Sequence, residues 1–168
     1  NLEDFRFFNE NEELSIRDDL SDIPDEHLAI EFNNFNLETF TSLLNPEELI
    51  AAGFVNGRLV LENPFGAPGI LGELKVDSLK VLETPLGNLS LNATSETFRD
   101  YILAMSLKDG GMDLDLDGNF QANEAGGNFD VELNLNQIDM EVIAGLSRGE
   151  LREGSGNISG LIEASGTT

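Results

Sequence analysis

The most specific chemical pattern in the sequence is an acidic motif that matches a calcium-binding loop. It follows the spacing D-x-D-x-D-G-x5-E, in which carboxylate and amide oxygens at fixed positions surround Ca²⁺ in an EF-hand. The candidate ligands are Asp113, Asp115, Asp117, Asn119 and Glu124. An EF-hand needs a helix on each side, and the glycines of Asp109–Gly111 and Gly126–Gly127 disfavour both helices. We therefore predict that the three aspartates form the solvated face of a strand, with a calcium loop as the weaker interpretation.

Other residues that could carry catalysis are sparse. The chain has no cysteine and a single histidine, His27, which excludes thiol catalysis and multi-histidine metal centres. The stretch Ile23–His27 reads as a turn, which predicts a surface position for His27 rather than a role as ligand or base. With 32 acidic residues, adjacent carboxylates such as Glu12 and Glu13 arise by chance. The sequence contains no G-x-S-x-G and no phosphate-binding loop, so we predict a protein that is not an enzyme and uses no cofactor.

The charge balance narrows the class of partner. Lys and Arg number 9 against 32 Asp and Glu, which gives a net charge of −23. Such a field repels phosphate backbones, so we expect no nucleic-acid partner. The chain is nevertheless 40% hydrophobic and contains 11 Phe, which favours a folded core over disorder.

Alternation of apolar and polar residues dominates the chain and predicts strands with one apolar face. We expect about ten strands of roughly four to eight residues each. They centre on Phe5–Phe8, Leu14–Ile16, Leu28–Phe32, Val55–Leu61, Leu74–Val76, Leu89–Ala93, Leu103–Leu107, Met112–Leu116, Phe129–Leu135 and Ile158–Ile162. Turn residues between them, at Thr84–Gly87, Asp109–Gly111 and Gly126–Asn128, indicate short antiparallel connections. The expected fold is all-β, an elongated antiparallel sheet with two short helical segments.

The two helical segments show apolar residues at helical rather than strand spacing. Leu37–Ala52 predicts a short helix with Asn36 as its N-cap, followed by a second helix that begins at Pro46. Ile138–Leu151 predicts the other helical segment. We expect the glycines that follow, Gly53 and Gly154, to end these segments.

The helical segments belong to an internal repeat. A shift of 103 residues, from Gly53 to Gly156, superposes Gly53–Leu59 on Gly156–Ile162, and residues further upstream match in the same register. A unit that recurs within one chain is typical of an elongated array. We assign residues 1–36 to the end of one repeat, 37–136 to a central repeat and 137–168 to the start of the next.

Four stretches of the chain resemble a known family: Gly53–Leu61, Leu86–Leu91, Leu114–Phe120 and Gly156–Thr167. They look like mid-chain segments of the AsmA-like family, which includes the translocation and assembly module subunit TamB. The resemblance implies a long sheet curled into an open trough with its apolar face inside. It also implies a periplasm-spanning, inner-membrane-anchored protein of a Gram-negative bacterium, which works with an outer-membrane barrel assembly factor. The family's N-terminal anchor and C-terminal barrel-contacting region have no counterpart in these residues.

An apolar trough would suit the movement of phospholipid acyl chains, because each CH₂ costs about 0.8 kcal/mol to expose to water. We therefore expect a non-catalytic conduit that carries phospholipid between the inner and outer membranes and supports outer-membrane assembly. We expect its lining to consist of Leu59, Leu61, Leu74, Val76, Leu89, Leu91, Leu103, Met105, Leu107, Leu114, Leu116, Phe120, Val131, Leu133 and Leu135. Two alternatives stay open: a closed sandwich core without ligand, and an extracellular or surface β-repeat adhesin or scaffold, with or without stiffening by calcium.

Overall fold

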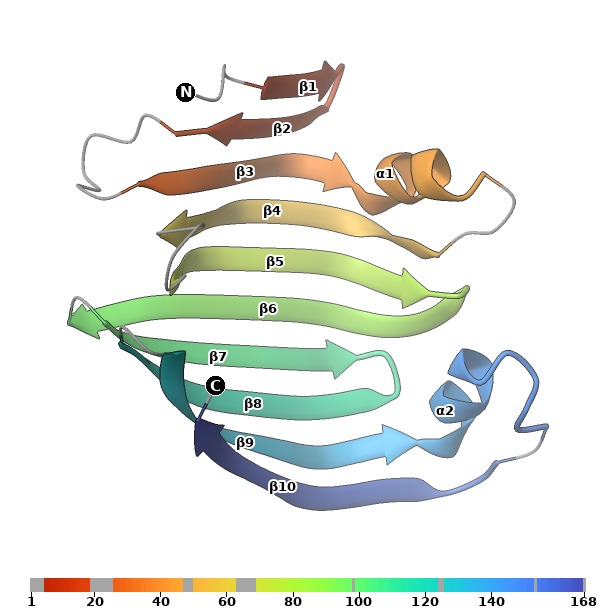
Figure 1. Ribbon diagram of the computed structural model, residues 1–168. Coiled ribbons are helices and arrows are strands. Elements are labelled where there is room, and N and C mark those ends of the chain that lie inside the picture. The colour runs from red at the N-terminus through yellow and green to blue at the C-terminus, as the bar shows by residue number, and fades with distance from the viewer. Residues whose placement is uncertain are drawn as a thin grey trace.

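The computed structural model describes residues 5–18, 26–46, 50–62, 69–97, 99–123, 126–152 and 154–167. Within them, ten strands form one antiparallel sheet whose spatial order is the chain order (Figure 1). The strands are β1 (Phe5–Asn9), β2 (Glu12–Arg17), β3 (His27–Asn36), β4 (Ala51–Glu62), β5 (Gly69–Val81), β6 (Thr84–Thr97), β7 (Asp100–Asp109), β8 (Met112–Asn123), β9 (Gly126–Asp139) and β10 (Asn157–Thr167). The helices are α1 (Leu37–Leu44) and α2 (Met140–Leu146). The predicted all-β class, an elongated antiparallel sheet with two short helices, is confirmed.

The strand registers sort the side chains onto two unlike faces. Leu91 pairs with Met105, Met105 with Leu116, and Leu116 with Leu133, so these side chains form one row across four strands. Because successive residues of a strand point to opposite faces, the period-two pattern puts most aliphatic residues on the side of this row; Ala29, Val60 and Leu71 are exceptions on the other side. We call this side the apolar face and the other side the polar face.

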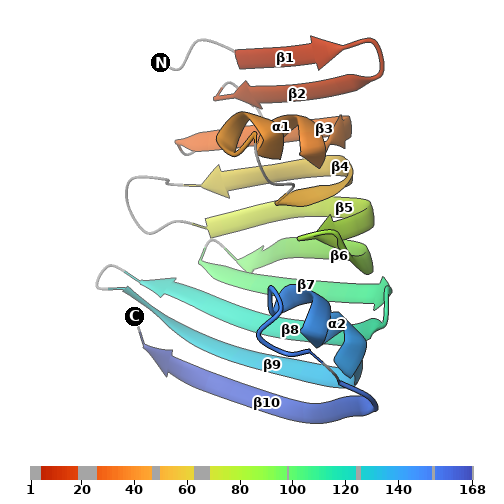
Figure 2. The same ribbon diagram turned by 90° about the vertical axis from the view of Figure 1, so that its right-hand side faces the viewer.

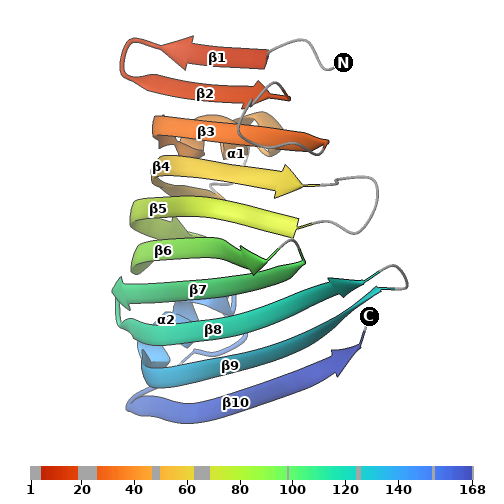
Figure 3. The same ribbon diagram turned by 90° about the vertical axis from the view of Figure 1, so that its left-hand side faces the viewer.

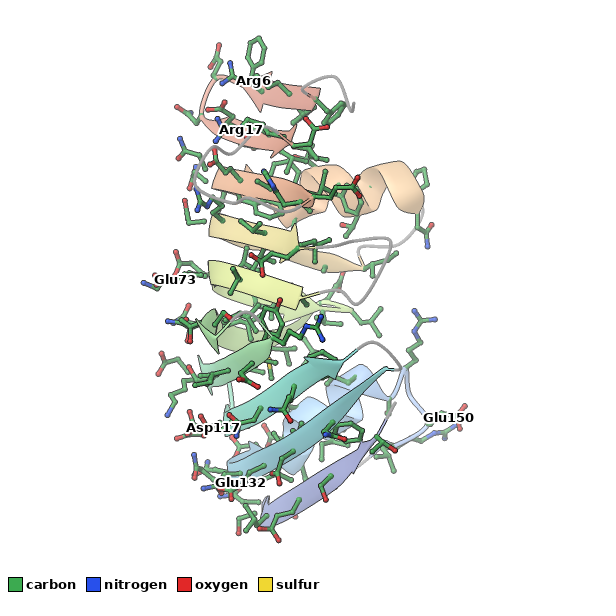
Figure 4. All side chains as sticks on the ribbon, turned by 60° about the vertical axis from the view of Figure 1, so that its left-hand side comes forward. Arg6, Arg17, Glu73, Asp117, Glu132 and Glu150 are labelled. Carbon is green, nitrogen blue, oxygen red and sulfur yellow. The ribbon has the colours of Figure 1, made fainter. Side chains whose placement is uncertain are left out.

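The polar face carries most of the charge of the sheet. Figure 4 shows the labelled side chains of five strands projecting from that face: Arg6, Arg17, Glu73, Asp117 and Glu132. Glu150, which follows α2, points away on the opposite side of the molecule. One face of the sheet is therefore solvated while the other is offered to apolar groups.

The strands are longer than the sequence predicted, and two expected turns lie inside them. Most strands run for 10 to 14 residues, because backbone pairing continues past the alternating segment. Thr84–Gly87 belongs to β6, and the reversal falls instead at Leu82 and Glu83, both with positive φ. Gly126 and Gly127 begin β9 rather than forming the turn before it. The turn at Asp109–Gly111 is confirmed.

Two local predictions near the first helix are wrong. The helix predicted from Pro46 to Ala52 does not reach its end, because Ala51 and Ala52 already pair with β5 as the start of β4. Gly53 accordingly lies within β4 rather than ending a helix. His27 is buried at 8% exposure and begins β3, where it pairs with Glu62, so its predicted surface position is incorrect; residues 23–25 of the predicted turn lie outside the described residues. Proline, glycine and histidine types alone do not reveal that strand pairing reaches these positions.

One side-chain hydrogen bond joins two strands that are not neighbours in the sheet. Tyr101 on β7 donates its hydroxyl to Oε2 of Glu62 on β4 at 3.0 Å. In a flat sheet these two strands would lie about 14 Å apart, because three inter-strand steps separate them. The two long side chains span this distance together, so the bond links β4 to β7 across the two strands between them. Figure 3 shows the accumulated tilt of β7–β10 relative to β1–β5, in the sense expected of a twisted open sheet.

The sequence repeat is reproduced register for register in the structure. Phe32 pairs with Gly57 and Phe35 with Val55 between β3 and β4; 103 residues later, Leu135 pairs with Gly160 and Ile138 with Ile158 between β9 and β10. Each pair of strands has its register shift at this same point. Helix α1 starts at Leu37 and α2 at Met140, which are also 103 residues apart. The β3–α1–β4 and β9–α2–β10 segments are thus two copies of one structural unit.

Both helices lie at the same ends of the strands (Figures 1 and 2). The Asn36 side chain caps α1 by accepting from the Glu38 backbone N–H at 2.9 Å. Thr41 then ties this helix to the sheet, because its buried hydroxyl donates to the Ala51 carbonyl at 2.8 Å. We call this end of the strands the helix margin and the opposite end the far margin.

Candidate apolar binding face

All of the predicted lining residues lie on the apolar face. They lie on β4–β9, and strand pairings join them in rows across the sheet; Leu59, for example, reaches Leu103 through Gly72 and Ala93. Val76, Leu107 and Leu114 are buried, and the other twelve predicted residues are partly exposed. A closed core would bury most of such a set, so this partial exposure distinguishes the face from the interior of a sandwich.

The three buried members belong to two hydrophobic clusters near the helix margin. In the first, Leu107 and Leu114 pack with Leu86 and with Val142 of α2. In the second, Val76 packs with Phe35 and Val55, and Leu37 of α1 joins the edge of that cluster. The helices therefore cover the apolar face along one margin and stabilise the sheet there.

A row of small residues crosses the apolar face nearer the far margin. It runs from β4 to β10, with each residue paired to the next: Leu59, Gly72, Ala93, Leu103, Gly118, Val131 and Ala164. Four of these seven positions are Gly or Ala. The neighbouring row toward the helix margin carries Leu74, Leu91, Met105, Leu116, Leu133 and Ile162. We call the first row the lane, because four of its seven residues are Gly or Ala, whereas the six named members of the second row are all Leu, Met or Ile.

At the far margin the lane opens into an apolar hollow of about 340 Å³. Its lining comes from β5–β9: Gly69, Ile70, Ala93, Tyr101, Ile102, Leu103, Gly118, Asn119, Phe120, Phe129 and Val131. None of these side chains is charged. The Tyr101 ring lies directly against Gly69, where any Cβ would overlap it, and stacks at a tilt on Phe120 with centroids 6.4 Å apart. The hydrogen bond from Tyr101 to Glu62 thus borders the hollow.

Sequence reasoning missed the lane and the aromatic rim. Gly72, Ala93, Gly118 and Ala164 have no distinctive pattern along the chain, since each is an ordinary small residue in its own strand. They become a feature only when the strands are placed in register, because the row runs perpendicular to the chain. One local signal exists: Gly72 and Ala93 lie at equal distances along the chain from the turn at Leu82 and Glu83.

The acidic motif forms a strand, as predicted. Residues 113–123 belong to β8, and Asp113, Asp115 and Asp117 alternate along it on the polar face. Asn119 also lies on β8 and pairs with Ile102 and Asp130, whereas Glu124 lies outside the described residues. The motif glycine, Gly118, faces the other side and forms part of the lane. Gly118, the glycine of the calcium motif, therefore belongs to the apolar face rather than to a calcium loop.

We call Asp113, Asp115 and Asp117 the acidic stripe. Lys108 on β7 and Asn136 on β9 contact two of its carboxylates. Lys108 Nζ lies 3.3 Å from Oδ1 of Asp113 and 3.3 Å from Oδ2 of Asp115, and Asn136 donates to the same two carboxylates at 3.0 and 2.9 Å. The Asn136 hydrogen bond, with a smaller contribution from Lys108, lowers the pKa of Asp113 below its usual range. Hydrogen bonds to Asp115 and Asp113 raise the pKa of Lys108. These contacts join β7, β8 and β9 on the solvated side of the sheet.

Within the described residues, neither helix is long and apolar enough to cross a membrane. Comparison of the chain with known protein families, with curated proteins and with solved structures finds no match. The candidate site therefore has to be judged on its own geometry: a one-sided apolar surface, a lane across seven strands, and an uncharged hollow at its margin.

Proposed function

We propose that the chain is a segment of a non-catalytic hydrophobic conduit that holds phospholipid acyl chains on its apolar face and carries them between the inner and outer membranes. The observation that carries this proposal is the lane, a continuous uncharged path across β4–β10 that the two helices leave uncovered. In the same proposal the protein is periplasmic and anchored in the inner membrane, and an outer-membrane barrel assembly factor is its partner through other regions.

The dimensions of the lane suit a hydrocarbon chain. Six inter-strand steps separate Leu59 from Ala164, which gives a length of about 29 Å. The hydrocarbon core of a bilayer is about 30 Å thick and holds two acyl chains end to end. The lane is therefore long enough for an acyl chain laid across the strands.

The chemistry of the face favours hydrocarbon over a peptide. The sheet already uses its backbone groups within its own plane, so the apolar face offers almost no hydrogen-bond partner. An extended peptide lying there would leave its amides unsatisfied, at a cost of about 1–3 kcal/mol for each buried group. An acyl chain has no such groups, and its burial gains about 0.8 kcal/mol per CH₂.

Photo-crosslinking in bacterial cells tests the proposal. A photoreactive residue is placed at Leu116 or Leu133 on the apolar face, and at the adjacent Asp115 or Glu132 on the polar face. We expect phospholipid adducts at the two leucine positions and none at the two acidic positions. Adducts at none of the four, or equally at both members of a pair, would contradict the conduit and favour a scaffold.

A second experiment tests the lane itself with the purified chain and a phospholipid whose acyl chain carries a diazirine. Gly118→Leu adds a side chain at the wall of the hollow, where the nearest atom to an added Cβ is Val131 Cγ2 at 3.5 Å, an ordinary van der Waals contact. We expect this variant to reduce labelling about tenfold, which corresponds to 1.4 kcal/mol. Asn134→Leu, which lies beside Asp115 on the polar face of the neighbouring β9 and does not line the hollow, is the matched control and should label like the wild type. Equal labelling of Gly118→Leu and the wild type would remove the lane from the acyl-chain path.

A further inference from the structure

The outer edge of β10 has no neighbouring strand among the described residues. β10 pairs with β9 through residues 157–167, and all of its residues except Gly166 are exposed. An unpaired strand edge presents a row of free backbone N–H and C=O groups that can hydrogen-bond another strand. The structural repeat says which kind of strand fits this edge, because β10 is the equivalent of β4, whose outer edge is occupied by β5.

Two glycines determine how β4 meets β5. Gly57 on β4 has φ +128°, and a Cβ there would overlap the carbonyl oxygen of Glu73 on β5. Gly72 on β5 also has φ +128°, and a Cβ there would overlap the carbonyl oxygen of Arg58 on β4. The two backbones thus approach so closely that each strand must supply a glycine to accommodate the carbonyl of the other.

β10 carries the equivalent of Gly57, but among the described residues no strand with an equivalent of Gly72 lies beside it. Gly160 is the equivalent of Gly57, and no heavy atom lies within 4 Å of the position its Cβ would take. Gly160 also lacks the positive φ of Gly57, whereas Gly156 has φ +98° and matches Gly53 at +138°. The carbonyl of Leu161, the equivalent of Arg58, is the group that an incoming strand has to accommodate.

We propose that the free edge of β10 is a binding surface for an antiparallel strand with a glycine opposite Ile162, followed at the second and fourth positions by apolar residues. This is the pattern of Gly72, Leu74 and Val76 in β5. Binding brings Gly160 to the positive φ seen at Gly57 and extends the apolar face by one strand. A β1 from a second copy of the chain lacks the required feature, because Phe5–Asn9 contains no glycine. This inference does not rest on the proposed function.

A peptide with the sequence of residues 69–81 is the direct probe, because it is β5 itself. Hydrogen exchange of the whole chain is measured with this peptide at up to about 1 mM, and with a Gly72→Val version of it. We expect exchange at residues 160–163 to slow about tenfold with the first peptide and to stay unchanged with the second. Equal protection by both peptides, protection of β1 instead of β10, or no protection would each overturn the proposal.

Substitution of the chain gives the reciprocal test. Gly160→Val should abolish protection by the peptide, although the variant should fold normally because its side chain meets open space. Ser159→Val, the neighbouring exposed position on β10, is the matched control and should bind like the wild type. Retained binding by Gly160→Val would refute the glycine requirement. Protection of β10 that grows with the concentration of the chain alone would show that a second copy occupies the edge, and would also refute it.

Discussion

Glycine-to-alanine substitution at two equivalent positions of the repeat should have opposite consequences for stability. Gly57 and Gly160 occupy the same place in the repeated unit, but among the described residues Gly57 has a paired strand on both sides, whereas Gly160 pairs with β9 alone. In Gly57→Ala the new methyl meets the Glu73 carbonyl, and the residue must hold a positive φ that side chains rarely adopt. Backbone strain and overpacking in the middle of a sheet should together cost about 2–6 kcal/mol. In Gly160→Ala neither penalty exists, so the smaller entropy loss of alanine should stabilise the chain by about 0.5–1 kcal/mol.

Gly149→Ala separates the two penalties. Gly149 has φ +86° but nothing within 4 Å of its Cβ position, so only the backbone term applies and the cost should be about 1–2 kcal/mol. Urea unfolding followed by circular dichroism gives the free energy of unfolding of all three variants against the wild type. The reasoning predicts that Gly57→Ala is the least stable, Gly149→Ala intermediate and Gly160→Ala the most stable. If Gly57→Ala and Gly160→Ala agree within about 0.5 kcal/mol, the close approach of β4 and β5 is not a determinant of the fold.

Three further predictions concern the turn, the helix margin and the acidic stripe. Leu82→Asn combined with Glu83→Gly should raise the free energy of unfolding by about 1–2 kcal/mol, because both residues have positive φ (50° and 64°) in a two-residue hairpin turn. Unchanged or lower stability in urea would contradict this prediction. Val142→Ala should lower the free energy of unfolding by about 2 kcal/mol, because it leaves a cavity in the cluster under α2. Substitution of the exposed neighbour, Glu141→Ala, should change the free energy of unfolding by less than about 0.5 kcal/mol. Equal effects would mean that α2 does not anchor the sheet. Asn136→Leu should let the pKa of Asp113 return toward its usual value. A lowered carboxyl pKa stabilises the fold above the ordinary pKa, and this stabilisation is lost as pH falls through the lowered pKa. The free energy of unfolding of the wild type should therefore exceed that of the variant at about pH 7 but not at about pH 2. A constant difference across that range in urea unfolding would disprove the assignment.

The fold could be predicted from the sequence because the pattern that marks each strand lies within that strand. Alternation marks each strand and fixes which residues share a face, so Leu116 and Asp115 could be assigned to opposite faces without coordinates. The repeat was visible for the same reason, because identical local requirements at Gly53 and Gly156 produce matching residues. Strand ends were less accessible: Thr84 and Gly126 are turn-forming residue types, yet cross-strand hydrogen bonds extend through them.

The lane and the hollow could not be predicted, because they arise between strands rather than along them. Tyr101 alternates with Leu103 as any strand residue would, and only the placement of β4, β5 and β7 in one sheet brings it to Gly69 and Glu62. His27 shows the same limit, since its burial depends on the pairing of β3 with β4. Features that need two or more strands in register therefore require the structure.

The spacing between the two helices has a consequence for directionality. Six strands separate the start of one structural unit, β3, from the start of the next, β9. Since neighbouring strands are antiparallel, an even number per period returns the chain to the same direction and the same face. An odd number would place α2 at the end of the strands opposite to α1. Any array built with this period keeps all of its helices at the helix margin. One long side of the array is therefore covered by helices and the other is not, over its whole length.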